Sequence, residues 1–375
     1  MLAYPNYTNC FLNIISSVKA YYSSPILYPT NPQVDNALKA RPKNIILGVI
    51  DGLSLTGLKQ NTDSGSFLRE NLVGSMTSVF PSSYVACINS FLSGIAPNEH
   101  GYLGSSLFLK EFGSVYSVSD SAVSSPIRNI LAYEDIFGGI KNSRQNPRVT
   151  VLSDKQLPVS AEFKLCRNTD VAYNEIITLS VGVRDTFTVL YINKTADLTV
   201  QTGTTSDEVY NSLSDIDKLF SDLASKLTDT LFIIISLHGF TQNNGQIHLA
   251  DIPELYNALF MNQTIEPRAA SFAVKERHLD EFCSVFSGLL GSEYMLFSKD
   301  KLLESKIFGG YRTHRRVDDF LGNVFAAAIS GRTFASDSPR QTKAVSGGIT
   351  ENEMILPLIM HSTSRDENFS HGKLI

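Results

Sequence analysis

An acidic residue stands directly at the end of a hydrophobic run. Residues 44–50 read Asn-Ile-Ile-Leu-Gly-Val-Ile, and Asp51 and Gly52 follow them. In an open α/β sheet, ligands bind beyond the carboxyl ends of the strands, so a carboxylate at this point is well placed to hold a cation. Asp-Gly after a strand is also an ordinary turn sequence, and Asp51 alone does not decide between these two interpretations.

A second segment makes the functional interpretation stronger. Residues 80–94 read Phe-Pro-Ser-Ser-Tyr-Val-Ala-Cys-Ile-Asn-Ser-Phe-Leu-Ser-Gly, and residues 96–101 read Ala-Pro-Asn-Glu-His-Gly. The Phe-Pro turn and the serines precede a run with the apolar spacing of a helix. This order of a turn, a helix and two glycine-closed motifs is too specific for a generic connection.

The elements that position these residues follow from the apolar runs at 45–50, 149–152, 187–192 and 231–235. The runs are short, β-branched and nearly continuous, which is typical of strands buried on both faces of a mostly parallel sheet. Helical patterns lie between or after them, at 85–92, 207–223 and 279–290. Alternating strands and helices predict an α/β fold in which helices sandwich a mostly parallel central sheet.

We expect residues 1–375 to form one domain, with residues 243–310 as an inserted cap subdomain. The chain has 375 residues, of which 43% are hydrophobic and 18% charged, as in a folded globular protein. The net charge of -5 gives no reason to expect nucleic-acid binding. The four cysteines are widely spaced and are expected to be free thiols. We see no signal peptide and no membrane-spanning run, so the expected location is cytoplasmic, away from membranes.

The motifs around Asp51 and residues 80–101 resemble those of the alkaline phosphatase superfamily, and in particular the type I phosphodiesterase/nucleotide pyrophosphatase branch. In that branch a strand ends in Asp-Gly, a Phe-Pro-x-x-Thr turn opens a helix, and a Pro-x-x-His-Gly motif follows. Further blocks fit at 206–209, 238–239, 308–309 and 347–358. The resemblance covers residues 44–360 and implies the same α/β fold.

The resemblance also implies a reaction. A Thr or Ser at a helix N-terminus attacks phosphorus, while two metal ions clamp the attacking and leaving oxygens. One ion is held by the strand-end Asp, the nucleophile and a later Asp-His pair, and the other by an Asp-x-x-x-His motif and a final His. These ligands cannot be lost without losing the ions.

Several of these positions hold other residue types in this chain. Asp51 matches the strand-end ligand, but Tyr84 stands at the position of the nucleophile. Counted back from Gly203, Ala196 falls at the Asp position of the Asp-x-x-x-His motif and Val200 at its His position. Both ligands of that motif are absent in this register.

The later motifs are altered in the same way. Asp-His-Gly has become Leu237-His238-Gly239, so His238 remains and its acidic neighbour does not. His-Gly-Gly has become Ser346-Gly347-Gly348. Asp51 and His238 are therefore the two surviving metal ligands, both belong to the same metal site, and we expect that site to be weak or empty.

Two residues could rebuild a metal site. Asp197 lies one position from the expected Asp, but it needs a local bulge to reach the metal. Tyr84 could bind metal or act as a nucleophile, yet without a metal its phenol has a pKa near 10 and stays protonated. Ser82 and Ser83 are expected to serve the turn and the helix cap, and His100 to order its loop.

These substitutions favour a catalytically inactive relative that keeps the fold for a binding, scaffold or regulatory role. The expected ligand is then a protein or a phosphorylated small molecule, the chain could form an oligomer, and no cofactor is expected. The alternative is an active phosphodiester or nucleotide hydrolase with a rearranged, single-metal site. That site would hold zinc or manganese on Asp51 and His238, with Tyr84 or Asp197 as an added ligand.

Overall fold

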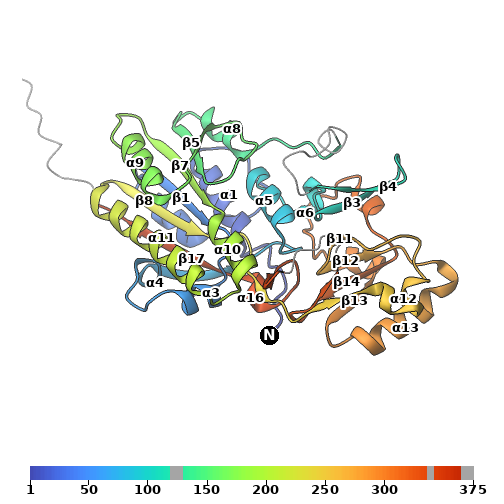
Figure 1. Cartoon of the computed structure of the whole chain (residues 1–375). Helices are drawn as coiled ribbons and strands as arrows, with labels where there is room; N and C mark the ends of the chain where they lie inside the picture. The colour runs from blue at the N-terminus through green and yellow to red at the C-terminus, as the bar shows by residue number, and fades with distance from the viewer. Residues whose placement is uncertain (119–129, 336–341, 365–375) are drawn as a thin grey trace, which may run out of the picture.

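Seven strands form the central sheet of the computed structural model, which describes residues 1–118, 130–335 and 342–364. The strand order is β2-β17-β8-β1-β7-β5-β6 (Figure 1). Strands β8, β1, β7, β5 and β6 run parallel, and β17 pairs antiparallel with both β8 and β2. The bounds are β1 Asn44–Ile50, β2 Leu72–Thr77, β5 Arg148–Ser153, β6 Glu162–Leu165, β7 Thr186–Ile192, β8 Thr230–Ile235 and β17 Ile355–Ser362.

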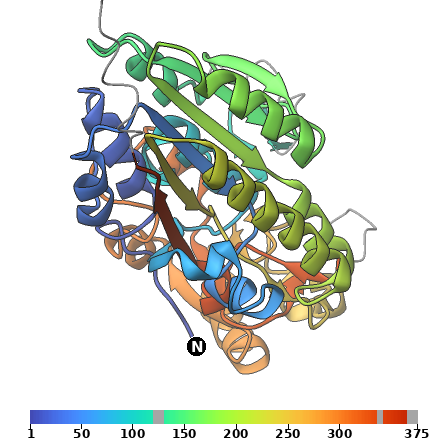
Figure 2. The same ribbon diagram turned by 90° about the vertical axis from the view of Figure 1, so that its left-hand side faces the viewer.

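Helices cover both faces of this sheet. One face carries α1 (Phe11–Tyr21), α2 (Pro32–Leu38), α5 (Tyr84–Ser93) and α8 (Ile136–Lys141). The other carries α3 (Leu55–Asn61), α4 (Phe67–Glu70), α9 (Thr169–Ser180) and α11 (Asp207–Lys226), and Figure 2 shows α9 and α11 on the same side of the strands. The central strand β1 is buried throughout and alternates between the faces, since Leu47 joins the first cluster and Ile46 the second.

The sequence predictions for the sheet and its helices are confirmed. The four predicted strands are β1, β5, β7 and β8, and the predicted helices at 85–92, 207–223 and 279–290 are α5, α11 and α13 (Leu279–Leu290). The continuous apolar runs correspond to parallel strands buried on both faces, which is the physical reason for that composition.

A second, antiparallel sheet lies beside the carboxyl-end side of the first (Figure 1). Its order is β13-β14-β12-β11-β3-β4. The bounds are β3 Ser106–Leu109, β4 Ser114–Ser117, β11 Thr264–Glu266, β12 Ala269–Phe272, β13 Tyr294–Ser298 and β14 Val324–Ala328. Segment 243–310 supplies β11, β12 and β13, while β3, β4 and β14 come from outside that range. The predicted domain boundaries stay a prediction.

Short elements connect the two sheets and cover the second one. The helical ones are α6 Pro97–His100, α10 Lys194–Thr202, η1 Leu249–Asp251, α12 Pro253–Tyr256, η2 Glu276–His278, α14 Lys299–Glu304, α15 Val317–Phe320 and α16 Glu351–Met354. Two small strand pairs join β10 (Gln246–Ile247) to β15 (Thr333–Phe334) and β16 (Ala344–Val345) to β9 (Thr241–Gln242). Among the described residues, no helix is long and apolar enough to cross a membrane.

Candidate functional site

Asp51 lies at the carboxyl end of β1, and its side chain is only 1% exposed. One carboxylate oxygen, Oδ2, accepts a hydrogen bond of 2.5 Å from the hydroxyl of Tyr191. The other, Oδ1, accepts the amide of Gly52 at 3.1 Å and lies 3.5 Å from His238 Nε2. Both oxygens of the surviving strand-end carboxylate therefore have partners within the protein.

Tyr191 reaches Asp51 because β7 runs parallel to β1. Val49 pairs with Tyr191, and the amide of Asp51 donates to the carbonyl of Ile192. Burial and the neighbouring charge of Asp51 raise the pKa of the Tyr191 phenol well above its usual value. The phenol therefore keeps its proton and donates a hydrogen bond to the carboxylate that the resemblance assigns as a metal ligand.

His238 is buried beside Asp51 in the loop after β8. Its Nδ1 lies 3.1 Å from the carbonyl oxygen of Gly239, and its ring meets Phe240 edge to face at 5.0 Å between centroids. The contact with Asp51 is an ion pair only when the imidazole is protonated. The structure thus brings the two surviving ligands together, with an aromatic ring against the histidine.

The positions that the resemblance assigns to the Asp and His ligands of a second metal site lie on α10. Ala196 and Val200 are four residues apart and share one face of this helix, where they pack with Phe240 and Ala344. Strand β16 lies against the helix, because the amide of Lys343 donates to the carbonyl of Val200 at 2.8 Å. We call Ala196, Val200, Phe240 and Ala344 the apolar cluster. It contains no group that could bind a metal ion.

Phe240 connects the apolar cluster to Asp51. A methyl group built on Gly52 would lie 2.6 Å from the Phe240 ring and 3.0 Å from the Ala196 side chain, and Gly52 has a positive φ of 81°. Only a glycine is compatible with this close approach and this backbone conformation. The ring therefore lies directly beside the residue that follows Asp51.

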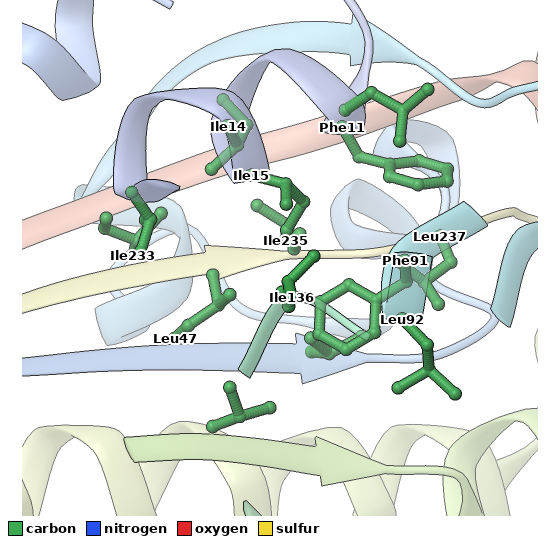
Figure 3. Packing of buried hydrophobic residues seen from close by; sticks show 14 of the residues in the cluster. Phe11, Ile14, Ile15, Leu47, Phe91, Leu92, Ile136, Ile233, Ile235 and Leu237 are labelled. Atoms are coloured by element: carbon green, nitrogen blue, oxygen red, sulfur yellow. The ribbon is translucent and has the colours of Figure 1, made fainter. Parts of the chain in front are cut away.

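Leu237 is fully buried and faces the main core. It packs in the main hydrophobic core with Phe91 and Leu92 of α5, and Figure 3 draws these three side chains together. Its backbone carbonyl accepts a hydrogen bond of 2.6 Å from Ser78 Oγ. A carboxylate at this position would be surrounded by hydrocarbon, which is costly without a compensating cation.

Ser346 follows β16 and is half-buried. The adjoining glycine loop is fixed by Glu353, whose Oε1 accepts the amide of Gly348 at 2.8 Å and which forms a buried ion pair of 2.7 Å with Arg268. Ser82 Oγ donates to the carbonyl of Gly348 at 2.7 Å, so this loop is tied to the start of α5. The framework of the final motif is kept, although its histidine is not.

Tyr84 is the first residue of α5 and is half-buried. Burial raises the pKa of its phenol, and the charges of Asp51, Asp197 and Asp154 raise it further. The ammonium of Lys155 lies over the ring, 4.0 Å from its centroid. The phenol is therefore neutral near neutral pH and is a poor nucleophile.

Ser83 is the N-cap of α5 by position, but its hydroxyl makes no capping bond. It is 4% exposed and makes no hydrogen bond of normal geometry among the described residues, but it lies close enough to the buried carboxylate of Glu266 to lower the pKa of that group. In the same part of the structure, the amides of Tyr84, Val85 and Ala86 donate to no acceptor. The predicted capping role of Ser83 is wrong, and the start of this helix keeps free donors.

The other residues singled out from the sequence lie apart from a metal site. Asp197 is exposed on α10, and within residues 1–118, 130–335 and 342–364 no group of three or more His, Cys, Asp or Glu side chains could hold a metal ion. His100 is buried, and its ring contacts Ser90 Oγ at 2.9 Å and accepts the amide of Tyr102 at 3.0 Å, as expected for a loop-ordering residue.

Sequence reasoning missed three residues of this region. Tyr191 and Phe240 were not singled out, and neither was Asp154, whose carboxylate accepts the amides of Asn193 and Lys194 at 2.8 to 3.0 Å and so caps α10. Asp154 directly follows β5, and a carboxylate at a strand end was a usable signal. No sequence signal places Phe240 against Gly52. As a set, the residues present do not fit two metal ions.

Comparison with known proteins identifies the family that the sequence motifs resemble. A family model described as type I phosphodiesterase / nucleotide pyrophosphatase matches residues 46–319. A search of curated protein sequences found no match.

Solved structures share the fold at low sequence identity. Murine ectonucleotide pyrophosphatase / phosphodiesterase 5, solved as an inactive variant in complex with AMP, is 17% identical with a TM-score of 0.61, over 86% of this chain and 90% of that one. The human protein of the same name is 15% identical with a TM-score of 0.60, over 85% and 87%. Phosphonoacetate hydrolase from Sinorhizobium meliloti 1021, in complex with phosphonoformate, is 13% identical with a TM-score of 0.62, over 86% and 91%.

Proposed function

The chain belongs to the type I phosphodiesterase/nucleotide pyrophosphatase family of the alkaline phosphatase superfamily, and we propose that it is a catalytically inactive member with a binding, scaffold or regulatory role. One observation carries the proposal. The hydroxyl of Tyr191 donates to Asp51 at 2.5 Å, while the apolar cluster on α10 takes the place of the second ligand set. A two-metal mechanism requires ligands at both places.

The nucleophile position supports the same proposal. Serine or threonine attack in this family depends on a metal that stabilises the alkoxide, and Tyr84 offers a phenol whose pKa is raised instead of lowered. A protonated phenol attacks phosphorus poorly. Ser83 lies near the buried carboxylate of Glu266, but that carboxylate already accepts the amide and the hydroxyl of Ser105 at 2.8 and 2.9 Å, so we do not expect it to activate Ser83 in place of Tyr84.

The N-terminus of α5 supports a phosphorylated small molecule as the ligand. The buried hydroxyl of Ser83 and the free amides of the first turn are donors of the kind that bind phosphate at helix N-termini. The murine relative was solved with AMP, and AMP is a suitable probe. The carboxylates of Asp51, Asp154 and Asp197 oppose an anion here, so we expect binding to be weak. A protein ligand is the alternative.

A second candidate function rests on the proximity of Asp51 and His238, which are 3.5 Å apart. A hydrolase with a single zinc or manganese ion would use these two residues and one further ligand, Tyr84 or Asp197. Tight zinc sites take three or four protein ligands, and Asp197 is exposed. This arrangement is therefore the less favoured of the two.

Turnover separates the two functions. We expect the purified chain with added zinc or manganese to release nitrophenol from a phosphodiester no faster than its Asp51→Ala variant does. Metal-dependent release that is lost in Asp51→Ala would contradict the inactive assignment.

AMP binding tests the ligand separately. It is measured by calorimetry on the wild-type chain and on Ser83→Ala as the matched variant. Equal AMP affinity in the two chains would exclude the N-terminus of α5 as the binding site.

We also propose a cytoplasmic location, since the four cysteines are free thiols. The names of the murine and human relatives describe ectonucleotide enzymes, so the location requires its own measurement. Fractionation of the source cells should recover the chain with the cytoplasmic proteins, and recovery in the medium would contradict this proposal.

A further inference from the structure

A small cavity lies behind the Asp51 site, at the carboxyl ends of β5, β6 and β7. Its volume is about 90 Å³. A cavity needs roughly 10 to 15 Å³ of this kind of space for one water molecule, so this one has room for a ligand of a few heavy atoms. It lies between α9 and α11, on the face of the central sheet opposite α5, which separates it from the start of α5.

The floor of the cavity is mostly hydrocarbon, formed by Ala172 of α9, Leu190 of β7, and Ile216 and Leu219 of α11, all of which are buried. The buried thiol of Cys166 and the hydroxyl of Ser212 also line the cavity, and this hydroxyl is paired with that of Thr195 at 3.1 Å. An apolar floor of this kind binds a short aliphatic group and does not hold ordered water well.

The rim carries two cations without partners. Arg167 and Lys194 are exposed, and neither side chain forms an ion pair or a hydrogen bond within the described part of the chain. Lys164, which lies nearby in sequence, is paired with Glu175 at 2.6 Å and does not compete for a ligand. Helix α9 begins at the same rim, at Thr169. The Asn168 side chain accepts the amide of Val171 at 2.9 Å, so the helix dipole, and not a fully free amide end, adds to the attraction for an anion.

The rim also carries two carboxylates, which are not equivalent. Both oxygens of Asp154 accept backbone amides at the start of α10. Asp215 of α11 is exposed and has no hydrogen-bond or ion-pair partner in the ranges that the structure describes. Asp215 is therefore the carboxylate that is available to a positively charged group of a ligand.

We propose that this cavity binds a small aliphatic α-amino acid. The side chain would lie on the apolar floor, the carboxylate would pair with Arg167 and Lys194, and the ammonium would pair with Asp215. Charged partners that converge on an apolar pocket give orientation as well as affinity. This site does not depend on whether the Asp51 site is active, because it uses other residues and no metal.

Calorimetry on the full chain with three probes tests the assignment. L-valine carries all three groups, isovalerate lacks the ammonium, and isobutylamine lacks the carboxylate. We expect valine to bind with the highest affinity and each of the other two to bind at least about tenfold more weakly, because each leaves one charged rim group unpaired. Failure of all three probes to bind would overturn the proposal.

Variants locate the site. Ala172→Leu fills the floor, and Arg167→Gln, an exposed substitution that should not affect folding, removes a rim cation; each should weaken valine binding about tenfold or more. Asp215→Asn should remove the preference for valine over isovalerate. Lys226→Gln, at the far end of α11, removes the same charge outside the cavity and should change nothing. The assignment would be overturned if neither Ala172→Leu nor Arg167→Gln weakened valine binding. It would also be overturned if Asp215→Asn still bound valine more tightly than isovalerate.

Discussion

The resemblance assigns metal ligands to two regions, the end of β1 and the helix α10, and these regions differ in how their side chains are stabilised. We call them the polar half and the apolar half of the proposed former metal centre. At the end of β1, Asp51 and His238 remain, and the Tyr191 hydroxyl provides a hydrogen bond to the carboxylate. On α10, the polar ligands are absent, and Ala196 and Val200 pack against Phe240. A buried carboxylate requires a partner, whereas an apolar cluster requires only packing, so the two halves would be stable without metal ions for different physical reasons.

The largest expected effect comes from restoring the acidic ligand next to His238. Leu237→Asp places a charge among buried hydrocarbon, and we expect a loss of about 4 kcal/mol or more in the free energy of unfolding. Leu237→Met, the matched control, should cost less than about 1.5 kcal/mol. Urea unfolding measures both. If the Leu237→Asp variant were as stable as Leu237→Met, an acidic side chain beside His238 would still be tolerated in the polar half.

Removing the aromatic ring tests the apolar half. Phe240→Ala leaves a cavity beside Gly52 and Ala196, and we expect a loss of about 3 kcal/mol in the free energy of unfolding. Phe260→Ala is the control, because that ring is 72% exposed and its removal should change stability by no more than about 0.5 kcal/mol. Equal effects in the two variants would mean that the apolar cluster does not stabilise the fold.

Removing the hydroxyl that faces Asp51 tests the polar half. Tyr191→Phe should cost about 1.5 to 3 kcal/mol, because the lost bond has a charged acceptor. Tyr294→Phe removes the hydroxyl of another buried tyrosine, whose acceptors are the neutral carbonyls of Pro267 at 3.0 Å and Arg332 at 3.4 Å, and should cost about 1 kcal/mol. Thermal or urea unfolding measures which of the two variants loses more of the free energy of unfolding. A larger loss in Tyr294→Phe would contradict the view that Tyr191 compensates the buried charge.

The smallest expected effect is on the titration of Tyr84. The charge of Asp51 raises the pKa of this phenol more than that of Asp197 does, so Asp51→Asn should lower the pKa more than Asp197→Asn. The folded chain keeps this proton above pH 10 while the unfolded chain releases it, so stability falls as the pH rises past about 10. Asp51→Asn should weaken that loss.

Tyrosinate absorbance follows this titration, with Tyr84→Phe as the reference that identifies the signal of Tyr84. A larger pKa change in Asp197→Asn than in Asp51→Asn would place Tyr84 closer to α10 than to the end of β1.

The sequence was sufficient for elements whose signal is local. The apolar runs predicted β1, β5, β7 and β8. The spacing from Gly203 assigned Ala196 and Val200 to the two motif positions, but only the structure shows that they share one face of the helix α10. Contacts between distant segments were not accessible in this way. Tyr191 meets Asp51 only through the lateral register of β1 and β7, and Phe240 folds back onto Gly52 through a loop that has no local signature.

The second sheet shows the same limit. Strands β3 and β4 lie more than 140 residues before β11 in the sequence, and antiparallel pairing of β3 with β11 rests on a single register pair, Ser106 with Ile265. Such a pairing depends on the tertiary fold and not on the hydrophobic pattern of either segment. The inserted subdomain at residues 243–310 stays a prediction, and no sequence signal identified the strands outside that range that pair with β11, β12 and β13.

We propose that the phenol proton of Tyr191 occupies the place at which a metal ion would bind Asp51 in an active family member. Equilibrium dialysis of the purified chain against zinc, followed by metal analysis, tests this proposal, with Asp51→Ala as the matched variant. We expect wild type and variant to retain the same substoichiometric zinc. Close to one zinc per chain in the wild type, lost in Asp51→Ala, would contradict it.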